Sequence, residues 1–224
     1  MWTDFLKYEL QRDGVSHVYY PARNPQSLLI TFACMGDRYN RVREFWNEEK
    51  WENVSYLFLC DVGSEGKPAQ WYVDRDALID FYAAQFTPGR IVTLGSSMGA
   101  FGALWHGFRL SAGAILAIAP AAPPLSFQGQ DFDETLWRRL QAKMLECRKL
   151  PALYIETTGH PPDHQMTRTV VSHYLNTGGR LIAESDPSDA THCGTSMGLP
   201  RHAENTMRYF LGWPVAGESS GDGA

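Results

Sequence analysis

The chain has 224 residues, of which 44% are hydrophobic and 12% aromatic, so it can bury a sizeable core and disorder is not expected. The net charge of −5 includes no basic block, which argues against nucleic acid as a partner. The sequence has no apolar run near the roughly 20 residues of a membrane span, and its four cysteines form no C-x-x-C motif for zinc or redox chemistry.

The amino-terminal residues lack the basic stretch followed by an apolar stretch that marks a secretion signal. Scattered cysteines are typical of a reducing compartment. We therefore expect a cytoplasmic protein that uses no metal and no cofactor, and its oligomeric state is left open. We expect one domain over residues 1–214, while the small polar residues of 215–224 predict a disordered tail.

The predicted strands begin with an edge hairpin. Asp13-Gly14 separates two strand-like runs, which is the pattern of an antiparallel hairpin. Six short and nearly continuous apolar segments follow, as expected of parallel strands buried on both faces. They cover residues 27–33, 54–60, 90–95, 113–119, 152–156 and 180–185.

Apolar residues at helical spacing lie between these segments. They mark helices around residues 39–46 and 78–82, after residue 99, and from Asp163 through Leu175 to a capping glycine at Gly178. The clearest stripe consists of Leu136, Trp137, Leu140, Met144 and Leu145. A last helix starts near Pro200. Alternating strands and helices predict an α/β domain with a mostly parallel sheet and helices on both faces.

Two segments match the G-x-S-x-G signature of a serine nucleophile: GSSMG at 95–99 and GTSMG at 194–198. The signature requires a strand before the serine and a helix after it, with small residues two positions away on either side. The first segment meets this requirement, and it selects Ser97 because Ser96 has Leu94 and Met98 two positions away. The second follows a polar loop, so Ser196 or Thr195 is expected to cap the last helix.

Strand, G-x-S-x-G and helix in this order of strands resemble the α/β-hydrolase superfamily, over about residues 15–213. The resemblance implies an α/β-hydrolase fold and a Ser-acid-His triad in chain order. The acid would follow the second strand after the serine and the histidine would follow the third. Asp163 and His192 stand at these places, with Glu156, Asp186 or Asp189 as alternative acids. Asp163 could instead be the N-cap of the helix that follows.

His192 is the only histidine in its loop, and it would act as general base and then general acid for Ser97. His106 and His173 lie on predicted helices, where packing or exposure is the simpler interpretation. The oxyanion hole would combine the Met98 backbone N–H with a second N–H from the loop after the first core strand. Cys34 or Met35 would supply this second N–H, since the loop lacks the H-G-G pattern of many esterases.

The insert between the strands at 113–119 and 152–156 has room for one helix and some loop, so the resemblance implies a minimal cap. Trp71 and Tyr72 could stack on a sugar ring, or could simply pack. The segments LLITFACMGDRYN and AQWYV resemble α/β-hydrolase-like proteins of bacterial surface-polysaccharide gene clusters. We expect a serine esterase or acyl hydrolase acting on acylated sugars or other small acyl esters. An acyltransferase or thioesterase with the same acyl-enzyme, or a non-catalytic scaffold, is the alternative.

Overall fold

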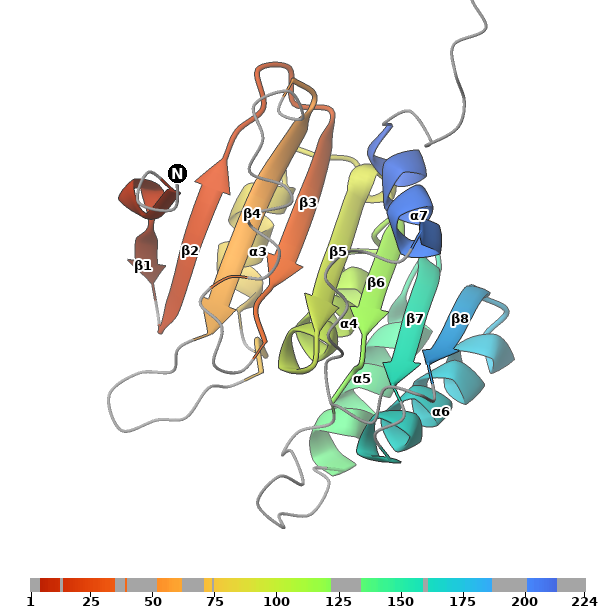
Figure 1. Cartoon of the computed structure of the whole chain (residues 1–224). Coiled ribbons are helices and arrows are strands. Elements are labelled where there is room, and N and C mark those ends of the chain that lie inside the picture. Colours follow the sequence, from red (N-terminus) through yellow and green to blue (C-terminus); the bar gives the residue numbers. More distant parts are fainter. Residues whose placement is uncertain are drawn as a thin grey trace, which may run out of the picture.

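A central sheet organises the computed structural model, which describes residues 5–12, 14–34, 39, 52–61, 71–73, 75–121, 134–158, 161–186 and 201–212. Within these residues, the sheet has eight strands in the order β1-β2-β4-β3-β5-β6-β7-β8 (Figure 1). The strands are β1 (Leu10–Arg12), β2 (Val15–Tyr20), β3 (Ser27–Phe32), β4 (Val54–Asp61), β5 (Ile91–Ser96), β6 (Ala114–Ile118), β7 (Ala152–Thr158) and β8 (Arg180–Asp186).

The strand directions confirm the predicted edge hairpin and mostly parallel sheet. β1 and β2 pair antiparallel across a turn in which Gly14 has a φ of +77°. β2 also runs antiparallel to β4, and every pair from β4 to β8 is parallel. β3 to β6 are buried at every position, which explains their continuous apolar sequence.

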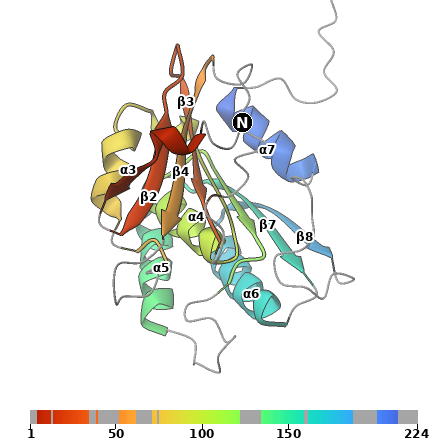
Figure 2. The same cartoon turned by 60° about the vertical axis from the view of Figure 1, so that its left-hand side comes forward.

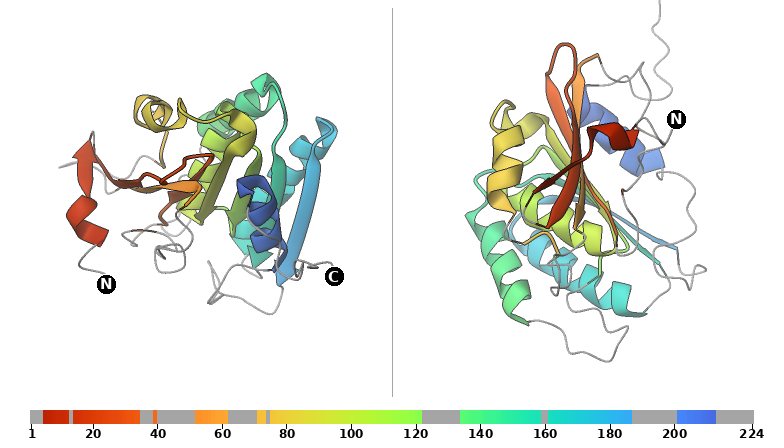
Figure 3. Two further views of the ribbon diagram at one scale, coloured as in Figure 1. Left: turned by 90° about the horizontal axis from the view of Figure 1, so that it is seen from above. Right: turned by 90° about the vertical axis from the view of Figure 1, so that its left-hand side faces the viewer.

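Helices cover both faces of the sheet, as predicted (Figures 2 and 3). One face carries α3 (Asp76–Ala83), α4 (Met98–Arg109), α5 (Glu134–Glu146) and α6 (Pro161–Asn176). The other carries α7 (Arg201–Leu211) and the short 3-10 helix η1 (Leu6–Tyr8), while a second 3-10 helix, η3 (Pro88–Arg90), leads into β5. The sheet therefore separates two apolar cores, one beneath each set of helices.

The helix in the predicted insert, α5, belongs to the layer of helices that covers the sheet. Trp137, Leu140 and Met144 are buried in the core, and Arg139 and Lys143 lie 4.9 and 4.5 Å from the centre of the Trp105 ring on α4. These contacts fix α5 against α4 through apolar packing and cation–π attraction. The rest of the insert, residues 122–133, lies outside the described residues.

The predicted apolar stripes are wrong at two positions. Leu145 is 67% exposed on α5, and Leu175 is 52% exposed on α6. Each directly follows a buried residue, Met144 or Tyr174, and a helix turns about 100° per residue. An apolar neighbour at that angle leaves the packed face and reaches solvent.

The predicted end of α6 is confirmed at Gly178. This residue has a φ of +83° and its N–H donates to the Leu175 carbonyl at 3.0 Å. A left-handed glycine that closes the last turn is a common helix C-terminus. The predicted helix around residues 39–46, apart from the buried Tyr39, and the tail at 215–224 lie outside the described residues.

Candidate active site

Ser97 lies at the junction of β5 and α4, as the G-x-S-x-G pattern predicts. Its φ of 54° and ψ of −122° are strained values for a residue with a Cβ. The Ser97 N–H donates to the Ile118 carbonyl at the end of β6 at 2.9 Å, and its carbonyl accepts from the Ala100 N–H at 3.0 Å. Its side chain makes no capping bond to α4. The backbone thus fixes the serine between a strand and a helix.

Gly95 and Gly99 permit this junction because the backbone crosses itself there. A Cβ on Gly95 would stand 2.1 Å from the Gly99 carbonyl oxygen, and a Cβ on Gly99 would stand 2.1 Å from the Phe32 carbonyl oxygen. Both distances are far below van der Waals contact. The two small residues of the signature are therefore a steric requirement of the close approach of β3, β5 and α4.

Two of the predicted oxyanion donors, Met98 and Cys34, belong to the described residues near this junction. Met98 is the first residue of α4, so its N–H has no acceptor within the helix, and the positive end of the helix dipole lies here. Cys34 comes two residues after β3, the strand that pairs with β5 on one side. Met35 lies outside the described residues. The structure thus brings Ser97, Met98 and the end of β3 together at the carboxyl ends of the central strands.

The other predicted triad residues are placed only in part. Asp163 is the third residue of α6, which starts at Pro161. It is therefore not the N-cap of this helix, and the capping alternative is wrong. The side chains of Asp163 and Asp186 lie outside the described part of the chain. His192 and Asp189 lie outside it altogether. The second serine motif, with Thr195 and Ser196, also lies outside it.

The alternative acid Glu156 lies in a carboxylate pair on the α7 side of the sheet. Glu156 and Glu184 are cross-strand neighbours on β7 and β8. The buried Tyr154 hydroxyl donates to Glu184 Oε2 at 2.7 Å and lies 3.5 Å from Glu156 Oε2. Burial, together with these carboxylates, raises the pKa of Tyr154 far above its ordinary value. Glu156 therefore belongs to a polar cluster that includes a second carboxylate.

His106 is a packed histidine, as expected. It is fully buried and its ring is stacked 5.6 Å from that of Phe32. Its Nε2–H donates to the Tyr72 carbonyl at 2.9 Å, while Nδ1 accepts from Arg109 Nε at 3.3 Å. Burial, followed by the charge of Arg109, lowers the pKa of His106 to about 3. The imidazole is neutral and serves the packing of α4.

Trp71 and Tyr72 also pack, and neither presents a face to a sugar ring. Tyr72 is fully buried and Trp71 is 8% exposed, edge-on to Phe101. Both have positive φ values, 57° and 64°. The contacts of Tyr72 come from residues up to 39 positions away, so no local signal in the sequence could have identified them.

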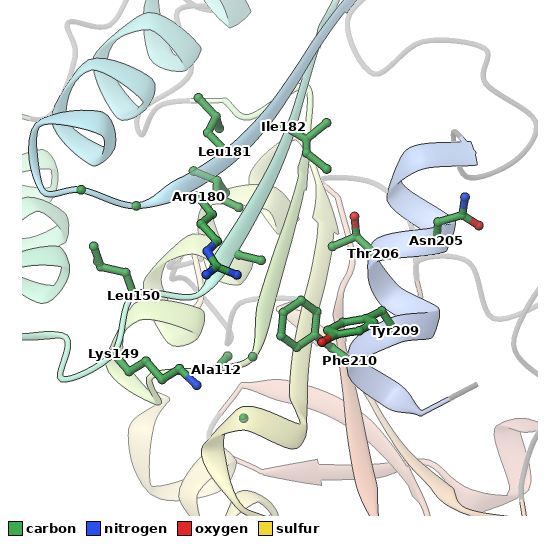
Figure 4. A pocket seen from close by; sticks show the side chains of 16 residues that line it. Ala112, Lys149, Leu150, Arg180, Leu181, Ile182, Asn205, Thr206, Tyr209 and Phe210 are labelled. Carbon is green, nitrogen blue, oxygen red and sulfur yellow. The ribbon is translucent and has the colours of Figure 1, made fainter. Parts of the chain in front are cut away.

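A cavity lies at the opposite end of the sheet from Ser97. It has a volume of about 740 Å³ and is lined by residues that precede or begin β6, β7 and β8 and by the end of α7. Lys149, Arg180, Tyr209 and Phe210 surround it (Figure 4). Among the described residues that line it, Ser97, Met98 and Cys34 do not occur. The described residues contain no cluster of potential metal ligands and no helix able to cross a membrane.

The strand order, the antiparallel first strands and the strained serine between β5 and α4 define the α/β-hydrolase fold. No family model and no curated protein matches the sequence. Solved structures with a similar fold include a capsule O-acetyltransferase of Neisseria meningitidis serogroup A. It is 16% identical, with a TM-score of 0.61, and the match covers 91% of this chain and 92% of the acetyltransferase.

Two hydrolases have a similar fold. The S-formylglutathione hydrolase of Staphylococcus aureus is 10% identical, with a TM-score of 0.56, over 82% of this chain and 90% of its own. The esterase PE8 is 16% identical, with a TM-score of 0.56, over 82% of this chain and 93% of its own. The chain therefore has the fold of these proteins over nearly its whole length.

Proposed function

We propose that the protein is a serine acyl hydrolase in which Ser97 is the nucleophile, His192 the general base and Asp163 the residue that orients the histidine. The observation that carries the proposal is the strained backbone of Ser97, at a φ of 54° between β5 and α4. A non-glycine residue is held in such a conformation only where its surroundings enforce it, and such residues cluster at functional sites.

The chemistry follows from the roles proposed for these groups. Ser97 Oγ would attack the carbonyl carbon of an ester while His192 takes the hydroxyl proton. The oxyanion would be bound by the Met98 N–H and by the N–H of Cys34 or Met35, each donor contributing about 3 kcal/mol to transition-state stabilisation. His192 would return the proton to the leaving alcohol. Water would then cleave the acyl-enzyme, and no cofactor is needed.

Acylated sugars or other small acyl esters are the proposed substrates. The full-length likeness to a capsule O-acetyltransferase favours a second candidate, in which a glycan hydroxyl rather than water accepts the acyl group. Both reactions share one acyl-enzyme. We propose the cytoplasm as the compartment, because the four cysteines form no paired motif.

Fluorophosphonate labelling tests the nucleophile. We expect the wild type and Ser196→Ala to be labelled and Ser97→Ala not to be. Label that persists in Ser97→Ala would refute the assignment, and an unlabelled wild type would favour a non-catalytic protein. In the labelled protein, product analysis with an activated acetyl ester, with and without an added oligosaccharide, separates hydrolysis from transfer.

The acid is tested by a pair of isosteric variants, Asp163→Asn and Glu156→Gln. We expect Asp163→Asn to lower kcat by about 10⁴-fold, as replacement of a triad aspartate by asparagine does. Glu156→Gln should retain most of the activity, because Glu156 contacts the Tyr154 hydroxyl. The opposite result would transfer the role of the acid to Glu156.

A further inference from the structure

The hydroxyl group of Tyr72 takes the place of one backbone hydrogen bond between the ends of β3 and β4. The Ala33 N–H donates to the Leu59 carbonyl at 2.9 Å, which continues the parallel ladder. In such a ladder the next bond joins the Asp61 N–H to the Ala33 carbonyl. Here the Asp61 N–H donates to the Tyr72 hydroxyl oxygen at 3.2 Å, and this hydroxyl donates to the Ala33 carbonyl at 2.7 Å.

The hydrogen bond from the Tyr72 hydroxyl to the Ala33 carbonyl determines the direction of the next backbone N–H, that of Cys34. β3 lies between β4 and β5, and Tyr72 holds the Ala33 carbonyl on the β4 side. In a planar trans peptide the carbonyl and the N–H point in opposite directions. The Cys34 N–H, in the same peptide, is therefore directed toward the β5 side, where Ser97 and the first turn of α4 follow the strand.

The preceding peptide shows the expected alternation. Its N–H, on Ala33, is bonded to β4, and its carbonyl belongs to Phe32, which pairs with Gly95 of β5. A Cβ on Gly99 would stand 2.1 Å from the Phe32 carbonyl oxygen and 2.9 Å from the Ala33 carbonyl oxygen, so both peptides lie close to the first turn of α4. Successive peptides at the end of β3 thus point alternately toward β4 and toward the candidate active site.

Tyr72 itself has a strained backbone conformation that hydrogen bonds hold. Its φ is 64°, a rare value for a bulky residue. The Tyr72 N–H donates to Asp61 Oδ2 at 3.2 Å, and the Tyr72 carbonyl accepts from His106 Nε2 at 2.9 Å. The ring packs edge-on against Phe32, with centroids 5.0 Å apart. The hydroxyl is therefore placed by contacts to β3, β4 and α4 together.

We propose that Tyr72 is a positioning residue, whose hydroxyl orients the Ala33–Cys34 peptide so that the Cys34 N–H completes the oxyanion hole with the Met98 N–H. The inference rests on the proposed function, and it selects Cys34 over Met35 as the second donor. Tyr72 touches no reacting atom. It acts only through the peptide that it holds.

The test is Tyr72→Phe, which removes one oxygen atom and keeps the ring. Without the hydroxyl, the Asp61 N–H and the Ala33 carbonyl can approach each other and form a direct hydrogen bond. This movement would turn the Cys34 N–H away from β5. We expect kcat/KM for an activated ester to fall about 10- to 100-fold, less than the 10²- to 10³-fold typical of a lost oxyanion donor. KM should stay within about twofold, because the ground-state carbonyl is bound weakly there.

A tetrahedral adduct provides a second readout. The affinity for a trifluoromethyl ketone, whose adduct carries an oxyanion, should weaken by the same factor as kcat/KM. The control is Tyr174→Phe, another fully buried tyrosine whose hydroxyl donates to a backbone carbonyl, that of Pro151. The control should lose comparable stability and keep wild-type kcat/KM and inhibitor affinity.

Selective ¹⁵N-cysteine labelling reports on the peptide directly, since the chain has four cysteines. The Cys34 amide signal should shift in Tyr72→Phe and stay in place in Tyr174→Phe. If Tyr72→Phe does not fold, Asp61→Asn serves instead, because it weakens the bond that holds the Tyr72 N–H and should give a smaller change in the same direction.

The outcomes separate the two proposals. Wild-type kcat/KM in the folded variant, or an unmoved Cys34 amide, would overturn the role of Tyr72 and leave the hydrolase intact. Absence of turnover and of fluorophosphonate labelling in the wild-type chain would overturn the proposed function, and this inference with it. A fall in kcat/KM with matched loss of inhibitor affinity, absent from Tyr174→Phe, supports both.

Discussion

Replacement of Gly95 by alanine should damage both the stability and the chemistry of the protein. The new Cβ would stand 2.1 Å from the Gly99 carbonyl oxygen and 2.7 Å from the Ala100 nitrogen. Both are backbone atoms at the start of α4, so no side-chain rotation relieves the clash, and β5 and α4 must separate by about 1 Å to restore contact. Overpacking of this kind costs about 1–3 kcal/mol.

The same displacement acts on Ser97, two residues away. A misplacement of about 1 Å at a reacting group can reduce the rate by about 10²-fold. We therefore expect Gly95→Ala to lower Tm by roughly 2–12 °C, from about 2–4 °C per kcal/mol for a chain of this size, and to slow fluorophosphonate labelling by about two orders of magnitude. Thermal unfolding and labelling kinetics on the same sample measure both effects.

Gly89→Ala is the matched control. A Cβ at Gly89 meets nothing within 4 Å, so the unfolding free energy should change by less than about 0.5 kcal/mol, with labelling unaffected. If Gly95→Ala matched this control in Tm and in labelling rate, the steric account of the serine turn would be refuted.

Three further predictions concern stability. On α5, Leu140→Ala should lower the free energy of unfolding, measured by chemical denaturation, by about 2–5 kcal/mol, because Leu140 is fully buried. Leu145→Ala should lower it by less than about 0.5 kcal/mol, because Leu145 is 67% exposed. Gly178→Ala should destabilise by about 1 kcal/mol through its φ of +83° alone, since a Cβ there meets no atom within 4 Å; unchanged stability would contradict this. His106→Gln should flatten the dependence of unfolding free energy on pH between about 6.5 and 3. In this window the unfolded chain binds a proton that the folded chain does not, so His106 makes stability rise with pH by up to about 1.4 kcal/mol per unit. An unchanged slope in His106→Gln would contradict the buried neutral imidazole.

The sequence was sufficient to predict features that depend on near neighbours. The strand before Ser97, the helix after it and the glycines that flank it are encoded in one continuous segment, residues 91–109, so the junction could be predicted before any contact was known. The apolar stripes failed at Leu145 and Leu175 because leucine is tolerated at the margin of a packed face. The spacing of apolar residues along the sequence predicts a helix more reliably than it predicts the width of the buried face of that helix.

The role inferred for Tyr72 could not be predicted in this way. Its partners Ala33, Asp61 and His106 come from three separate elements, and only the sheet order brings them together. The roles of Asp163 and His192 rest on their order in the chain and stay predictions. The turn at Ser97 could thus be predicted because its geometry is local, whereas groups whose geometry depends on tertiary contacts could not.

The bond from the Ser97 N–H to Ile118 has a consequence for how the protein should fail when heated. Because the strained backbone of Ser97 is secured by the central strands β5 and β6, it can relax only when those strands separate, which is the last part of such a fold to open. The backbone of Ser97 should therefore not lose its conformation before the rest of the domain unfolds. The reactivity of Ser97 toward a fluorophosphonate should persist up to the cooperative transition and vanish within it.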